Sequence, residues 1–115
     1  MKEFTSSITV QLVYYNNTYQ FDADPFEFSP QATDDDGGIL WDCTQTFVVD
    51  TPDDAALREF RYPRVAIVTL KDSHQHSYQV GTREVPARVH LSRHLQKTVL
   101  ALTCQMLTNP LESEL

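Results

Sequence analysis

Apolar and polar residues alternate along most of this 115-residue chain, and no other feature limits its fold as strongly. From Phe4 to Tyr15 one phase is apolar, and the opposite phase carries Thr, Ser and Gln. A period of two puts successive side chains on opposite faces of a strand, so it predicts strands with one buried face. The pattern returns from Ile39 to Asp50 and from Val85 to Leu91, which favours a mainly β protein.

Two hairpins follow from the turn chemistry. Asn16-Asn17 is a good tight turn, because asparagine tolerates positive φ, and it leads into a return strand at Thr18–Phe21. Arg64 to Lys71 is nearly continuous in apolar residues, which predicts a central strand buried on both faces. A turn at Asp72–His76 then leads into an antiparallel return strand at Ser77–Val80.

One short α-helix is expected near residues 52–60. Thr51 suits the N-cap, Pro52 suits the first helical position, and Asp54 favours the positive end of the helix dipole. Pro63 ends the turn that follows.

The last apolar run, Thr98 to Leu107, fits two structures. Alternation favours a strand, and the run is rich in Thr and Val with no convincing helix cap. A helical alternative stays open, because apolar residues also recur at helical spacing at Leu91, Leu95, Val99, Leu102 and Met106. We favour the strand.

These segments add up to six or seven mostly antiparallel strands in one domain over residues 1–115. A β-sandwich or a partly open barrel would bury the alternating apolar faces. The first strand and the strand that starts near Val85 are the expected sheet edges, the latter because Pro86 lacks an N–H. Residues 22–38 read as an acidic loop and residues 111–115 as a frayed tail.

The charge and the apolar runs limit the partners. A net charge of −7 argues against nucleic acid and against anionic membranes, which both need clustered Lys and Arg. No apolar run approaches the roughly 20 residues of a membrane span. The N-terminal residues lack the apolar core of a signal peptide, so a cytoplasmic location is expected.

The two cysteines, Cys43 and Cys104, each lie in the apolar phase of an alternating run. That position favours buried, reduced thiols that act as small hydrophobes. A disulfide stays open if their strands are neighbours, although a cytosolic setting disfavours one.

No motif for catalysis or for a cofactor is present, so we expect no enzymatic activity and no bound cofactor. The chain has no G-x-S-x-G, and three glycines cannot build a phosphate loop. Candidate ligands for a divalent metal are His74 and His76 with Asp34 and Asp36, provided that the hairpin turn and the acidic loop meet. Exposed turn histidines and a solvated loop are the favoured interpretation.

A protein–protein contact is better supported by the sequence. Tyrosine is enriched in interfaces, and Val13 and Tyr15 make the first strand apolar on its second face. The acidic loop can cover that face, or another subunit can. Tyr19 and the polar-phase residues Arg88 and His90 complete the interface candidates.

Part of the chain resembles a known group of proteins. The residues that carry the resemblance are Trp41–Asp50, Val65–Ser73, Tyr78–Thr82 and Val85–Ala87. This layout resembles small β-rich proteins encoded in prophage and related mobile-element gene clusters, which are often assigned to virion assembly and to the tail. The resemblance spans about 41–107, implies self-association or partner binding in a virion particle, and carries over no catalytic residue.

Two functions are therefore expected. The first is a non-enzymatic structural or assembly protein that acts through protein–protein contacts or self-association. The alternative is a small-ligand or divalent-metal-binding β-barrel module, with the acidic loop and His74 and His76 at its mouth.

Overall fold

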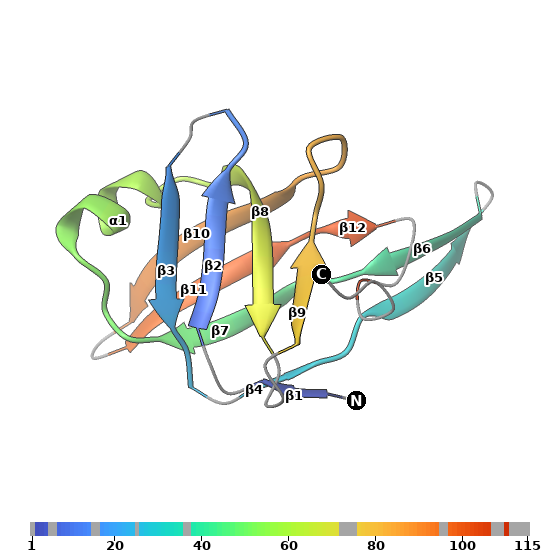
Figure 1. The fold of residues 1–115 in the computed structure, drawn as a ribbon, viewed down its shortest axis with the longest axis horizontal. Coiled ribbons are helices and arrows are strands. Elements are labelled where there is room, and N and C mark those ends of the chain that lie inside the picture. The colour runs from blue at the N-terminus through green and yellow to red at the C-terminus, as the bar shows by residue number, and fades with distance from the viewer. Residues whose placement is uncertain are drawn as a thin grey trace.

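The chain forms a mainly β structure of antiparallel sheets with one short helix (Figure 1). This confirms the fold class that the alternating pattern predicts. The described part of the chain contains more strand segments than expected, because three long runs are interrupted and a predicted loop contains strands. The computed structural model describes residues 2–4, 7–14, 17–24, 26–35, 38–71, 76–94, 97–106 and 110. The expected tail at 111–115 lies outside these residues.

The main sheet has seven antiparallel strands in the order β3-β2-β8-β10-β11-β7, with β9 paired to β8 beside this path. Both predicted hairpins are present, since β2 pairs with β3 and β8 with β9. The strands of this sheet are β2 (Ser7–Leu12), β3 (Thr18–Asp22), β7 (Gln45–Val49), β8 (Arg64–Lys71), β9 (Ser77–Val80), β10 (Ala87–His94) and β11 (Lys97–Thr103).

The sheet folds over on itself at β8. The first residues of β8 pair with β10, as in Ala66 with Ala87, and its last residues pair with β9, as in Val68 with Val80. As a result β3, β2, β8 and β9 form one layer, and β10, β11 and β7 form a second layer behind it (Figure 1). The core lies between these layers.

The outer strands β3 and β7 meet beyond the end of β3. Ala23 forms an isolated antiparallel bridge with Val49, and the Asp50 N–H donates to the Asp22 carbonyl at 2.8 Å. The structure is therefore an open barrel whose two edges touch over a short stretch.

The expected sheet edges are wrong. Strand β10, near Val85, lies between β8 and β11, and β2 lies between β3 and β8. Pro86 precedes the first residue of β10, so its missing N–H removes no hydrogen bond from the ladder. The first predicted strand is also divided, because β1 (Lys2–Phe4) pairs with β4 (Phe26–Phe28) in a separate two-stranded sheet.

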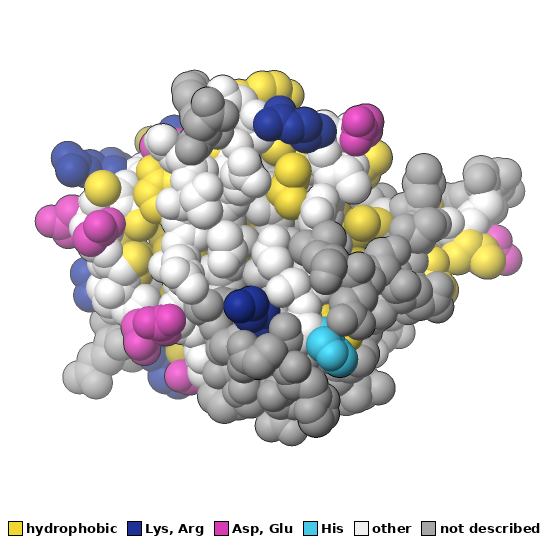
Figure 2. Space-filling view, viewed as in Figure 1, with side chains coloured by type: hydrophobic (Ala, Val, Ile, Leu, Met, Phe, Trp, Pro, Cys, Tyr) yellow, Lys and Arg dark blue, Asp and Glu magenta, His cyan; other side chains and the backbone are white. Residues whose placement is uncertain are grey.

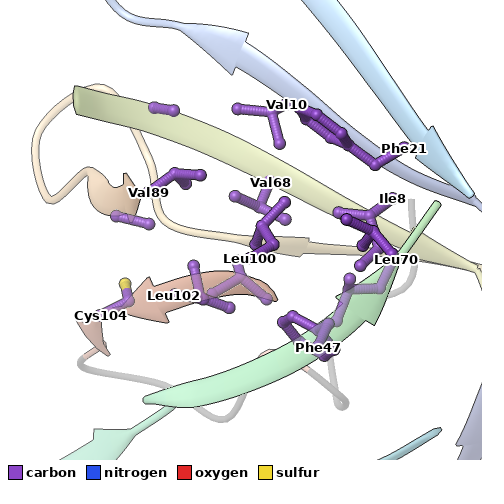
Figure 3. Close-up of a cluster of buried hydrophobic side chains, with 14 of the residues drawn as sticks. Ile8, Val10, Phe21, Phe47, Val68, Leu70, Val89, Leu100, Leu102 and Cys104 are labelled. Carbon is purple, nitrogen blue, oxygen red and sulfur yellow. The ribbon is translucent and has the colours of Figure 1, made fainter. Parts of the chain in front are cut away.

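The core contains the apolar phase of each strand. Figure 3 shows Val10, Val68 and Leu100 pointing into the space between the layers, and none of the three is exposed to solvent. Thr98, also fully buried, is the polar exception among the described residues, and its hydroxyl shares a hydrogen bond of 3.1 Å with Thr51. Leu102 continues the buried phase of β11, so the run from Thr98 is a strand and not a helix.

Helix α1 (Asp54–Glu59) lies at one end of the barrel, and the residue that follows it, Phe60, packs into that end. Phe60 is fully buried, with ring centroids 5.1 Å from Tyr19 and 5.8 Å from Phe21. The N-cap is Asp53, whose carboxylate accepts the Ala56 N–H at 2.9 Å, and not Thr51 as expected. In the described part of the chain, no helix has the length and apolar character to cross a membrane.

The prediction of an acidic loop at 22–38 is wrong. This segment holds β4 and then β5 (Gln31–Asp35), which pairs with β6 (Gly38–Asp42) in a three-stranded sheet completed by β12 (Gln105–Met106). Two phenylalanines tie β4 to the body. Phe28 is 1% exposed, and the Phe26 ring lies 4.6 Å from that of Phe47.

Candidate interaction surfaces

The first candidate surface is the arm, which we define as strands β5 and β6. It projects beyond the two-layered body (Figure 1). Its strands pair from Gln31 with Asp42 to Asp35 with Gly38. On the far side of β6, β12 pairs only with Asp42 and Trp41. Within the described residues, the outer edge of β5 and the 38–40 edge of β6 therefore have no strand partner.

The arm exposes apolar surface beside acidic side chains. Ile39 is 58% exposed, Leu40 and Trp41 are half-buried, and Asp34 on β5 is exposed. Figure 2 shows hydrophobic and acidic side chains together at the projecting end of the molecule. A two-stranded hairpin without a core is only marginally stable in water, and free strand edges are sites where further strands add.

The arm is a direct continuation of the sheet. Asp42 of β6 pairs with Gln105 of β12, and Gln45 of β7 pairs with Leu102 of β11. Both strands advance by three residues between these two pairs, so the pairing register of β6 with β12 continues into that of β7 with β11. At the junction the Cys43 N–H donates to the Cys104 carbonyl at 2.8 Å. This unbroken register holds the arm in its outward direction.

The two cysteines at this junction are free and buried, which confirms the expected buried thiols. Burial raises the pKa of Cys43 to about 12 and that of Cys104 to about 11. Beside them, the hydroxyl and the N–H of Thr44 hydrogen-bond Asp42 and lower the pKa of its carboxyl group. The junction therefore combines inert thiols with a carboxylate on the half-buried residue Asp42.

The second candidate surface is the basic groove, next to the place where β8 pairs with β10. It consists of two hollows of about 390 and 310 Å³ that share Pro63 and Arg88. The first hollow is also lined by Leu12, Tyr14, Arg64 and Val65, and the second by His90, Ala101 and Thr103. Apolar walls and basic side chains are thus mixed along one continuous depression.

The basic side chains of the groove differ in whether they have a hydrogen-bond or ion-pair partner. The Arg64 Nε donates to the Glu59 carbonyl at 2.9 Å and lies 3.7 Å from Glu59 Oε1. Arg88 is exposed and has no hydrogen bond or ion pair with any residue that the structure describes. His90, two residues along the same face of β10, is half-buried and also lacks such a partner among those residues. The groove can therefore accept an anionic group.

The predicted interface residues do not form one cluster. Arg88 and His90 both line the basic groove. Val13 borders it through its backbone, because its N–H donates to the Val65 carbonyl at 3.2 Å and its carbonyl accepts from Arg83 at 3.4 Å.

Two other interface candidates lie elsewhere. Tyr19 packs its ring on Phe60 and belongs to the margin of the core. Tyr15 lies outside the described residues.

The sequence did not predict the surface positions of three residues. Ile39 lies in the same apolar phase of the alternating pattern as buried Phe47. The pattern alone does not show which residues of that phase are buried by other parts of the protein. Tyr14 continues the apolar phase of Val10 and Leu12 in the sequence but is 77% exposed, because β2 ends at Leu12. Arg64 enters the groove only through the pairing of β8 with β10.

The metal candidates are only partly described. His76 is exposed just before β9 and Asp34 is exposed on the arm, whereas His74 and Asp36 lie outside the described residues. Among the residues with defined positions, no three His, Cys, Asp or Glu side chains group as metal ligands. Comparisons of the chain with protein-family models, curated proteins and solved structures found no match. What the two surfaces bind is therefore inferred from their own chemistry.

Proposed function

We propose that this protein is a non-enzymatic structural component that self-associates through protein–protein contacts. The observation that carries the proposal is the arm, whose two strand edges have no strand partner within the described residues and whose Ile39 is exposed. Both edges present main-chain groups to a strand of another molecule, which is the way that β-strand addition gains affinity. Burying one Ile side chain contributes about 1.5–3 kcal/mol, and each added hydrogen bond about 0.5–1.5 kcal/mol.

A cytoplasmic assembly of repeated copies, such as a phage-like tail, is the setting that we propose. The resemblance of residues 41–107 to β-rich prophage proteins supports it. The net charge of −7 also supports a protein partner over nucleic acid or an anionic membrane.

Light scattering coupled to size exclusion tests this proposal, from micromolar to millimolar concentrations of the full chain. We expect concentration-dependent species larger than the monomer. Ile39→Asp should shift them to monomer, because a carboxylate in the contact must lose its hydration. Val48→Asp is the matched control, since Val48 is 37% exposed on β7 outside the arm. A wild-type protein that stays monomeric throughout overturns the proposal.

A second candidate function is binding of a small anionic ligand in the basic groove, favoured by the guanidinium of Arg88, which has no ion pair with any described residue. A thermal-shift series with inorganic phosphate and small dicarboxylates tests it, because a ligand that binds only the folded state raises Tm. The same series with divalent cations tests the metal-binding alternative. An Arg88→Gln variant should lose the anion response and keep its unliganded Tm.

A further inference from the structure

We infer that the arm of one copy binds the basic groove of a second copy, in a head-to-tail contact. The inference rests on the proposed self-association and names the two surfaces that meet. Different surfaces on the two molecules make this contact heterologous, so repetition produces a closed ring or an open filament.

The geometry of the arm excludes its own groove as the binding site. The pairing register stays the same across the junction, from the pair Val49 and Thr98 in the body to the pair Trp41 and Met106 at the arm. The arm therefore extends the ribbon of β7 and β11 away from the body (Figure 1). The basic groove lies on the body, beside the pairing of Val65 with Arg88. Reaching it would require breaking the backbone pairing at the base of the arm.

The charges of the two surfaces are complementary. On the arm, Asp34 is exposed and has no ion pair with any described residue. In the groove, Arg88 also has no ion pair within the part of the chain that the structure describes, and Arg64 and His90 add basic groups on either side. Because the whole protein is acidic, two copies repel except where a basic area of one faces an acidic area of the other. This selects orientation as well as partner.

The apolar parts also match. Ile39, the most exposed large aliphatic side chain among the described residues, lies on the arm. Pro63, Val65 and Ala101 provide apolar walls in the groove. A hollow of about 390 Å³ has the size of sites that bury an apolar group between a few polar contacts. Neither surface has another described element that covers it.

A mixing experiment tests the contact. Arg88→Glu keeps the arm and disables the groove, whereas Ile39→Asp keeps the groove and disables the arm. We expect each variant alone to be monomeric, with association weakened about a hundredfold or more. A mixture should form a 1:1 dimer and nothing larger, because one functional arm meets one functional groove. Light scattering and analytical ultracentrifugation measure this.

Two controls make the result specific. Arg93→Glu makes the same charge change on exposed Arg93 of β10, outside the groove, and should associate like the wild type. Asp34→Arg is a second arm variant, and its exposed position on a strand preserves the fold. The arm of Asp34→Arg should bind the groove of Arg88→Glu, because the two charges of the proposed ion pair are exchanged. Cooperative thermal melts verify that every variant is folded.

The outcomes separate the two proposals. If the wild type associates and Arg88→Glu associates equally well, the head-to-tail contact is wrong and arm-to-arm pairing replaces it. If both single variants are monomeric and their mixture stays monomeric, the contact is also wrong. A monomeric wild type overturns self-association itself.

Discussion

At the scale of single residues, burial controls the chemistry of the two cysteines. Cys43 is 1% and Cys104 3% exposed, and loss of solvent is the main cause of their raised pKa values. The negative charge of Cys104, when ionised, raises the pKa of Cys43 further. Because the thiolate is the reactive form, these thiols are inert at neutral pH.

The free energy of unfolding should fall as the pH rises above 9. In the unfolded chain both thiols ionise near their ordinary pKa of 9.0, whereas in the folded chain they stay protonated up to about 11 and 12. The unfolded state then binds fewer protons, so the thiol contribution is complete below pH 9 and is lost as the pH passes through the folded values. Denaturation midpoints at pH 8 and pH 10 measure it. A Cys43→Ala/Cys104→Ala variant should show a smaller decrease, and an equal decrease would contradict the assignment.

At the scale of elements, the connection between β9 and β10 allows little change. Gly81 has φ of +87°, and its N–H donates to the Met106 sulfur at 3.4 Å. A Cβ at this position would lie 2.8 Å from the Ala87 nitrogen. Gly38, where β6 of the arm begins, also has positive φ, +116°, but a Cβ there would meet open space.

These two glycines form a matched pair for substitution. Gly38→Ala should cost about 1–3 kcal/mol from backbone strain alone. Gly81→Ala should cost more, because the clash with the backbone at Ala87 adds to the same kind of strain. Chemical denaturation of both variants checks the order. Equal costs would show that the β9–β10 connection yields to the added methyl group.

At the scale of the whole molecule, β3 and β7 touch over a short stretch at the open seam of the barrel. One hydrogen bond of this contact joins the Asp50 N–H to the Asp22 carbonyl at 2.8 Å, and another joins the Asp24 N–H to the Val48 carbonyl at 3.0 Å. Both outer edges of the main sheet are thereby partly covered, whereas the edges of the arm have no strand partner among the residues with defined positions. This contrast is why the arm, and not the barrel edge, is the expected place for strand addition.

Removing one of these closing bonds should loosen the barrel without touching the core. Asp50→Pro eliminates the N–H donor and should cost about 0.5–1.5 kcal/mol. Asp50→Ala keeps the donor and removes only an exposed side chain, so it should stay within about 0.5 kcal/mol of the wild type. Amide exchange of Asp24 should accelerate in Asp50→Pro. Unchanged exchange would mean that the closing contact is not cooperative.

Local patterns were sufficient to predict the kind of structure. Alternation identified the strands and their buried phase, as in Val68 and Leu100, because a strand turns successive side chains to opposite faces whatever its neighbours are. Asparagine, proline and aspartate located the two hairpins and the helix, since their backbone preferences act within a few residues. The same reasoning predicted the burial of both cysteines and named Arg88 and His90 as surface residues.

Only the tertiary structure decided which strands lie side by side and which apolar residues are covered. Pairing between distant segments depends on how whole faces pack, and nothing within a single strand records it. The interpretation of the acidic segment at 22–38 as a loop is wrong because Asp34 and Asp35 lie in β5, a strand that contributes no described residue to the core. Ile39 and Phe47 share one pattern, yet one is exposed and the other is buried, because β6 leaves the body and β7 does not. The basic groove likewise exists only because the pairing of β8 with β10 brings Arg64 and Arg88 to one place.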